Sequence, residues 1–461
     1  MAAVKSERAG VYVLFAVVVL ACALGNLTQT VMNSMLPALQ AELGISAGVG
    51  QWLTTAYMLV IGITVPIVTF LTLRFELKHL LVSTLVLFMA GALVALAAPG
   101  FAVLLVGRVL QAIAAGITLP LVQSIAMLRF PPGQNATAMG IAGIAMGFAP
   151  NIGPLIGGAL VDSWGWRSFF ALLLVVLVVL LVVCALCIRR EGKGAADASL
   201  DVASFVLSTL GFGGLLLAFS NASNMALASP LVWGFLIVGA VCLFAFVLRQ
   251  KRLVRPLISM RVFSSHTFRA SFVMQDFLFA SFMGITLIAP LCVQGLMGGT
   301  ALQAGIVFIP ATILALIVNP LAGILCDKVG VRPVVVCGAA FLAAGAVSMA
   351  FVSADTPLWL LTAMQTVRAC GVSTLIGPLN SWGLSGLPRD ITMDGSALFA
   401  CARQACASLG TALMVFAITQ LTARAATGAV PAALGYQVAF GISAVFSCVV
   451  LVVALAKVRT R

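Results

Sequence analysis

The stretch Gly147-Phe-Ala-Pro150-Asn151-Ile-Gly153-Pro154-Leu-Ile-Gly157-Gly158 decides the fold, and it lies inside a long apolar segment at about 136–161. Proline and glycine are the least favourable residues in a soluble helix. A membrane helix tolerates both, because neighbouring helices re-satisfy the loosened backbone, and small residues let a second helix approach closely. We therefore interpret the positions from Pro150 to Gly158 as a smooth, bendable face that serves as a gate or hinge. The alternative is an ordinary seam of helix packing.

The composition predicts that the whole chain belongs to a membrane. Its 461 residues are 62% hydrophobic and 8% charged, whereas soluble proteins carry about a quarter charged residues. Apolar runs recur along the full length, and many exceed the roughly 20 residues that a helix needs to cross a bilayer. The first run is too long for the core of a signal peptide. These features predict an all-α polytopic membrane protein.

Hydropathy predicts fourteen spans, at residues 11–38, 49–73, 79–98, 102–126, 136–161, 168–188, 202–222, 230–249, 270–294, 301–326, 333–352, 357–379, 396–421 and 436–457. With the N-terminus in the cytoplasm, 20 of the 25 Lys and Arg residues fall in cytoplasmic segments, 2 in outer loops and 3 within spans. Such asymmetry is typical of a correct topology. We therefore expect both termini in the cytoplasm, and we attribute the net charge of +13 to these loops rather than to nucleic-acid binding.

The two ends of the chain echo each other. We predict an N-terminal six-helix bundle at 1–190, a C-terminal one at 265–461, and a linker with two extra spans at 191–264. The loop after the tenth span places Asp327, Lys328, Gly330 and Arg332 beside helix ends, where a carboxylate and cations can pair in one state and separate in another. We interpret it as a cytoplasmic latch. The corresponding loop after the second span lacks the aspartate, and we expect Arg74, Glu76 and Lys78 to supply a substitute pair.

These motifs resemble those of the major facilitator superfamily, and six plus two plus six spans is the layout of its fourteen-helix drug:proton antiporter family. The opening stretch is similar to the antiporter signature Gly-x-x-x-Gly-Pro-x-x-Gly-Gly. The loop at Asp327 is similar to Gly-x-Leu-x-Asp-Arg-x-Gly-Arg, and Gly107-Arg108-Val-Leu-Gln111 to Arg-x-x-Gln-Gly. The resemblance implies two pseudo-symmetric bundles, a hinge that helps to seal one side, a role for Arg108 in proton transfer, and alternating access.

Asp276 is the acid that lies well within a predicted span. We place Asp162 at the outer end of the fifth span, and the other ten acids, Asp394 among them, in tails or loops. A charge inside a bilayer is costly and usually functional, so we predict that Asp276 and Arg108 couple transport to protons. The alternative is that Asp276 is a static partner of a buried arginine. Thr28 stands where the family usually has an aspartate, which leaves open a weak or absent coupling.

Polar side chains on several spans predict a substrate cavity between the bundles. The predicted lining comprises Asn26, Thr30, Asn33, Tyr57, Gln111, Gln275, Asn319, Arg368 and Arg403. Such groups also hold helices together, and hydrogen bonding to backbone carbonyls is an equal alternative for Arg403. Cys184 and Cys187 form a CxxC pair, which we interpret as apolar core residues. We predict no metal, no cofactor and no enzymatic activity.

Taken together, the residues predict a secondary active exporter of amphipathic drugs or related small molecules, driven by protons. The alternative is a carrier of the same fold for a specific metabolite or organic anion, with weak or no proton coupling. Three arginines against one acid within the spans support that alternative. The expected setting is the cytoplasmic membrane. The expected partners are substrate, protons and lipid, and we expect a monomer.

Overall fold

The computed structural model describes residues 2–45, 47–131, 134–188, 201–224, 229–253, 256–299, 301–426, 431 and 433–458, and its regular structure in these ranges is entirely helical. The first part of the chain forms α1 (Ala2–Leu43), α2 (Ala47–Thr64), η1 (Val65–Ile67), α3 (Val68–Arg74), α4 (Leu77–Leu96), α5 (Phe101–Leu128), α6 (Asn135–Gly143), η2 (Ile144–Phe148), α7 (Ala149–Trp164) and α8 (Arg167–Cys187). The middle forms α9 (Val202–Asn224) and α10 (Pro230–Arg252). The last part forms η3 (Met260–Ser264), α11 (His266–Gly295), α12 (Ala301–Ile306), α13 (Ile309–Val329), α14 (Val331–Met349), α15 (Leu358–Ser385), η4 (Arg389–Ile391), α16 (Thr392–Ala426) and α17 (Leu434–Lys457).

Eleven helical segments of the described chain are long and apolar enough to cross a membrane. Large apolar side chains such as Val175, Phe244 and Val452 are exposed on α8, α10 and α17, as lipid-facing surfaces require. The prediction of an all-α polytopic membrane protein is therefore confirmed. The count differs from fourteen because Asn135–Phe148 and Val202–Ala218 are shorter apolar helices, and because α15 carries polar residues, Gln365, Arg368 and Asn380, in its interior. Fourteen spans stays a prediction.

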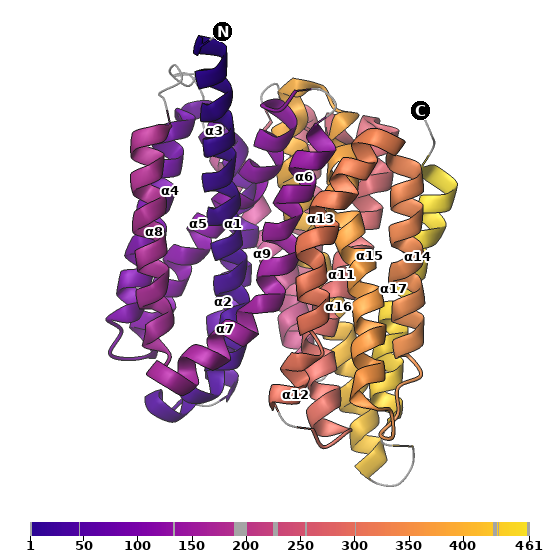
Figure 1. Ribbon diagram of the computed structural model, residues 1–461. Coiled ribbons are helices and arrows are strands. Elements are labelled where there is room, and N and C mark those ends of the chain that lie inside the picture. The colour runs from indigo at the N-terminus through magenta and orange to yellow at the C-terminus, as the bar shows by residue number, and fades with distance from the viewer. Residues whose placement is uncertain are drawn as a thin grey trace.

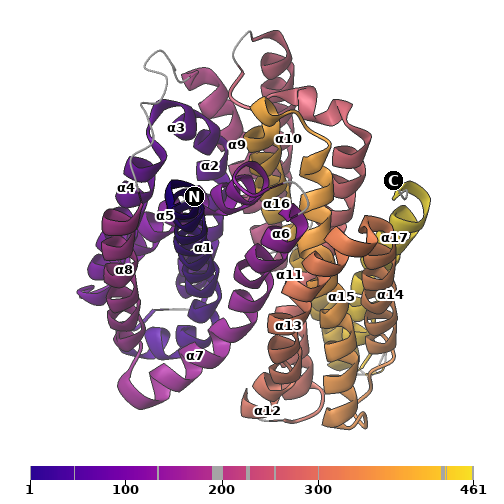
Figure 2. The ribbon, with the colours of Figure 1, turned by 45° about the horizontal axis from the view of Figure 1, so that its top comes forward.

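The helices form two groups, and α9 lies between them with α10 packed on it (Figures 1 and 2). The α9 helix packs against α2 in the first group and against α16 in the second, and α10 packs against α9. The start of α1 and the end of α17 lie at the same end of the bundle (Figure 1), which we call the N/C end. The α9–α10 hairpin therefore contacts both groups through α9.

The α6–η2–α7 segment runs along the boundary between the groups. At the N/C end, α6 packs against α13 and α15 of the second group (Figure 1). Toward the opposite end, α7 packs chiefly against α1 and α8 of its own group. The change of partner falls at η2, so the two groups are held together through α6 near the N/C end.

Candidate functional site

The hinge stretch contains a backbone irregularity with an identifiable cause. Residues Ile144–Phe148 form a π-helix, in which the Ala149 N–H donates to the Ile144 carbonyl. In that register the next N–H would belong to residue 150, and Pro150 has none, so the Ala145 carbonyl loses its partner. The Asn26 Nδ2 of α1 donates to it at 3.0 Å. Asn26, predicted to line the cavity, thus compensates the proline of the hinge.

The glycines that follow let α7 approach α1 closely. A Cβ on Gly153 would overlap Thr30 Oγ1, and one on Gly157 would overlap Ser34 Oγ, whereas a Cβ on Gly158 would meet nothing within 4 Å. Gly153 and Gly157 therefore form the contact face, and Gly158 does not take part in it. The side chains of Asn33 and Pro154, which we also predicted as site residues, lie outside what the structure describes.

Arg108 is fully buried among α1, α2 and α5. Its guanidinium donates to the carbonyls of Thr28 at 3.0 Å and Leu53 at 3.3 Å, and to Gln111 Oε1 at 3.2 Å. The guanidinium carbon of Arg108 lies 4.1 Å from the centre of the Tyr57 ring, and the Tyr57 hydroxyl donates to the Gly25 carbonyl. The structure brings Arg108, Tyr57 and Gln111 together as one cluster. It does not bring Asp276 to Arg108, and none of the described ion pairs involves Arg108.

Asp276 meets a different arginine. It lies half-buried on α11 and interacts electrostatically with Arg403 of α16, although none of the described ion pairs joins the two. The Arg403 guanidinium stacks 4.8 Å from the Phe279 ring and donates to the Met146 sulfur at 3.7 Å. Met146 belongs to η2, the irregular part of the hinge. Arg403 of the second group therefore contacts the π-helical segment of the first group, and Asp276 lies within electrostatic range of that arginine.

Arg368 is the least satisfied cation in the described interior. It is fully buried on α15, and its Nε donates to Gln365 Oε1 at 3.0 Å. The Phe282 ring lies 5.9 Å away. Both terminal nitrogens, Nη1 and Nη2, lack a hydrogen-bond partner. Burying an unpaired cation is expensive, so the site favours a negatively charged or strongly polar group beside Arg368.

The remaining predicted cavity residues bond to their own helices, and two of them also pack against a glycine of a neighbouring helix. Thr30 donates to carbonyls of its own helix, Asn26 and Leu27, and packs against Gly153. Asn319 of α13 donates to the Ala315 carbonyl and packs against Gly143 of α6. Gln275 of α11 donates to the Ser271 hydroxyl at 3.3 Å. The oxygens of Asn319 and Gln275 are buried without a partner, so both retain an acceptor. The assignment of these residues to a substrate cavity stays a prediction.

The C-terminal latch loop makes a specific contact at the N/C end. Asp327 at the end of α13 accepts hydrogen bonds from the first amides of α6, from Ala136 N at 3.2 Å and Thr137 N at 2.8 Å, and from Thr137 Oγ1 at 2.7 Å. A carboxylate is favoured there because the first amides of a helix lack backbone partners and carry a positive dipole. Gly330, with φ of 96°, ends α13 and begins α14. Asp327 therefore joins the two groups directly.

The predicted substitute latch in the N-terminal half is wrong. Glu76 pairs with His79 at 2.8 Å within the same turn rather than with Arg74 or Lys78. The Lys78 ammonium donates to the Ala185 and Ile188 carbonyls at the end of α8, at 2.7 and 2.6 Å. Free carbonyls at a helix end attract a cation, so Lys78 fastens α8 within its own group. Arg74, Lys328 and Arg332 are exposed.

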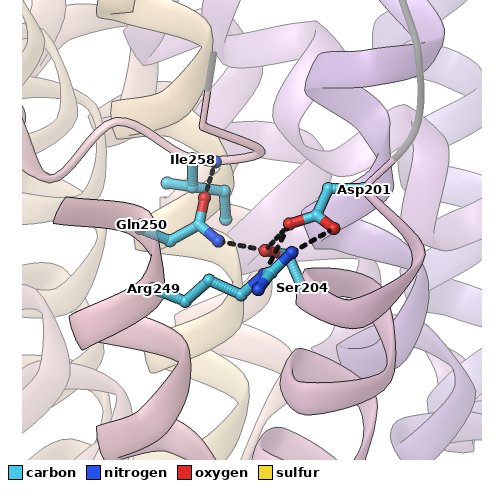
Figure 3. Close-up of polar contacts among 5 residues, drawn as sticks. All are labelled: Asp201, Ser204, Arg249, Gln250 and Ile258. Atoms are coloured by element: carbon cyan, nitrogen blue, oxygen red, sulfur yellow. Dashed lines mark hydrogen bonds and ion pairs between the residues drawn. The ribbon is translucent and has the colours of Figure 1, made fainter. Parts of the chain in front are cut away.

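A polar cluster that we did not predict ties α9 to α10 (Figure 3). Arg249 holds the Asp201 carboxylate with two hydrogen bonds of 2.8 and 2.9 Å, and these bonds, followed by one from Ser204, hold the Asp201 pKa well below its usual range. The Gln250 side chain donates to Ser204 and accepts from the Ile258 amide at 3.2 Å. The sequence does contain a signal for this cluster: Asp201 stands just before one apolar run, and Arg249 stands near the end of the next.

Asp394 corrects a second prediction. We placed it in a loop, but it lies in the first turn of α16 and is 6% exposed. It accepts a hydrogen bond from the Ser259 amide at 3.1 Å. Among the described residues, His, Cys, Asp and Glu do not gather in a group that could hold a metal ion.

Comparison with known proteins matches residues 18–411 to the family model of the Major Facilitator Superfamily. The lincomycin resistance protein LmrB of Bacillus subtilis is 31% identical over 85% of this chain and 82% of its own length. The multidrug export protein EmrB of Haemophilus influenzae is 28% identical over 85% of this chain and 77% of its own length. The crystal structure of the human organic anion transporter MFSD10 (TETRAN) superposes with a TM-score of 0.67 at 14% identity, covering 97% of this chain and 99% of that one.

Proposed function

The chain belongs to the major facilitator superfamily, and from this we propose that it is a proton-driven exporter of amphipathic small molecules in the cytoplasmic membrane. Its relatives and its fold are those of transporters and not of enzymes. Transporters of this superfamily bind small-molecule substrates, and relatives at about 30% identity are named for drug resistance and export. These names support export of a drug-like compound.

The observation that carries the proton coupling is the position of Asp276. It lies within the apolar helix α11, in electrostatic range of the buried Arg403, which contacts Met146 of η2. When Asp276 is ionised, it attracts the Arg403 guanidinium. When it is protonated, that attraction is lost, and the contact of Arg403 with Met146 of η2 is no longer opposed by Asp276. Protonation of one carboxyl thus changes the contact between the second group and the bending segment of the first.

Alternating access would use the elements that join the two groups. We propose that the N/C end is cytoplasmic and that Asp327 closes it by holding the start of α6. The hinge at Pro150 would let α6 swing while α7 stays packed on α1. Residues 1–190 and 265–461 would move as two six-helix bundles, with 191–264 between them, in a monomer of fourteen spans that belongs to the drug:proton antiporter family.

The test is transport by purified protein in liposomes with an imposed pH gradient. A gradient of about two pH units corresponds to about 2.7 kcal/mol, or a limiting accumulation of about 100-fold for one-to-one exchange. Asp276→Asn keeps the shape and removes the titratable charge, so it should lose gradient-driven accumulation yet retain downhill exchange. Asp355→Asn, an exposed loop acid, is the matched control. Undiminished accumulation by Asp276→Asn would refute the proposal.

A second candidate is a carrier of organic anions. Arg368 supports it, because two of its buried nitrogens lack a partner and a carboxylate would supply one. The superposed human protein is named as an organic anion transporter, which adds a structural parallel. Efflux of cationic, neutral and anionic dyes, with and without a protonophore, separates the candidates. Selective efflux of anionic dyes, abolished by Arg368→Gln, would favour this second function.

A further inference from the structure

The α9–α10 hairpin is attached to α16 of the second group at two well separated places. Beyond the middle of α16, Ala412 forms a buried apolar pair with Val232 of α10. The other attachment is at Asp394, in the first turn of α16, and it lies roughly 27 Å away along the helix at 1.5 Å per residue. Helix α9 packs against α16 as well. Two such attachments fix the direction of the hairpin relative to α16.

The attachment at Asp394 is made by a short strap, residues 256–259, that follows α10. Gln250 near the end of α10 accepts a hydrogen bond from the Ile258 amide at 3.2 Å, and Asp394 accepts one from the Ser259 amide at 3.1 Å. Adjacent amides of the strap therefore bond to the hairpin and to the second group. Ile258 and Ser259 are both buried, and a hydrogen bond in such a place is stronger than one in water.

The contact of the hairpin with the first group is of a different kind. Gly213 of α9 faces Leu59 and Ile63 of α2. Leu216 of α9 packs against Gly62 of α2. Apolar surfaces of this kind can part within a bilayer at little cost, because lipid tails are as apolar as the side chains that they replace. The strap therefore holds the hairpin to the second group more firmly than these contacts hold it to the first.

We propose that the hairpin travels with the second group during transport and parts from the first group along the α2–α9 contact. The moving body then comprises the residues from Asp201 onward, and not only the C-terminal six-helix bundle. The Asp201–Arg249 pair joins α9 to α10 (Figure 3), so both helices follow the strap. Thr69 of α3 lies beside Asp394, but this contact joins the first group to α16 and not to the hairpin. The proposal rests on the alternating access of the proposed function.

Disulfide formation between paired cysteines in the purified full chain tests which contact parts, and it requires no substrate. The three pairs are an α10–α16 pair, an α2–α9 pair and a group pair that joins the two groups directly: Val232→Cys with Ala412→Cys, Leu59→Cys with Gly213→Cys, and Ser124→Cys with Ser396→Cys. In the group pair the two native hydroxyls lie 2.9 Å apart. A disulfide requires Cα atoms within about 7 Å, so a small separation stops its formation. The wild-type chain, oxidised in parallel, accounts for the native cysteines.

Gly323→Leu separates the two groups, because even a Cβ at Gly323 of α13 would overlap the Ala136 carbonyl of α6. Gly441→Leu is the matched control in the second group, since a Cβ at Gly441 would meet nothing within 4 Å. In Gly323→Leu, we expect disulfide formation in the group pair and the α2–α9 pair to slow by about tenfold or more. The α10–α16 pair should keep its rate. All three pairs should keep their rates in Gly441→Leu.

Asp327→Asn repeats the comparison without added bulk, because it removes the latch and leaves the packing of the glycines unaltered. It should slow the same two pairs by a smaller factor. If the α10–α16 pair slows with the group pair while the α2–α9 pair keeps its rate, the hairpin travels with the first group and the proposal is overturned. Equal behaviour of the two hairpin pairs in both variants would overturn it as well. An unchanged group pair in both variants would instead refute the separation of the groups in the proposed function, and the proposal with it.

Discussion

The contact between Asp327 and α6 leads to a quantitative prediction about closure at the N/C end. Asp327→Asn keeps one acceptor oxygen, but its side-chain NH2 group then faces one of the α6 backbone N–H groups and cannot accept from it. The substitution also removes the negative charge from the start of α6. Loss of one charge-assisted hydrogen bond and of the helix-dipole interaction together costs about 2 kcal/mol at this half-buried position. That difference corresponds to about a 30-fold shift from the closed to the open arrangement.

Hydrogen–deuterium exchange reads this shift directly, because the amides of Ala136 and Thr137 are the donors to Asp327. In Asp327→Asn, a peptide that covers the start of α6 should exchange about 30-fold faster. Thr137→Val removes one bond of the three and should have a smaller effect. Glu76→Gln is the matched control, since Glu76 pairs with His79 in another loop, and it should also weaken transport less than Asp327→Asn. Unchanged protection in Asp327→Asn, or equal loss in Glu76→Gln, would refute the latch.

Three further predictions concern the hinge and the hairpin. Gly157→Leu should stop transport at normal expression, because any Cβ there overlaps α1, whereas Gly158→Leu should be tolerated because that position is open; efflux at matched membrane levels checks both. Asn26→Leu should lower the free energy of unfolding by about 1–3 kcal/mol, because the Ala145 carbonyl loses its hydrogen-bond donor. The loss should be smaller in a Pro150→Ala background, which restores a backbone donor, and thermal unfolding of the wild type, the two single variants and the double variant measures the difference. The pKa of Asp201 is depressed in the folded state. The stabilisation by Asp201 is therefore present above the unfolded pKa of about 3.9 and is lost as the pH falls toward the folded pKa. Asp201→Asn should lower the unfolding temperature by the same small amount from pH 8 to pH 5, which corresponds to less than about 1 kcal/mol because the Asp201–Arg249 pair is partly exposed.

The sequence by itself determined the class of fold and the position of the helix irregularity before Pro150. Both depend on local properties: a run of apolar residues must be helical in lipid because its backbone has no other partner, and proline removes a backbone donor wherever it stands. The same reasoning located Asp327 at a helix end and Asp276 inside a span. It also identified Arg108, Arg368 and Arg403 as cations within spans.

Only the tertiary structure decided which of these groups meet. Arg108 and Arg403 are both embedded cations, yet Arg403 is the one within electrostatic range of Asp276, while Arg108 donates to backbone carbonyls of α1 and α2. Glu76 pairs with His79 instead of Arg74. Asp394 is buried and accepts a hydrogen bond from the segment that follows α10. Hydropathy and spacing record which residues are apolar and how they repeat along one helix. They do not record the rotation of that helix about its axis or which helix it packs against. A side chain reaches a partner 100 or more residues away only when the rotation and the packing partner are both fixed.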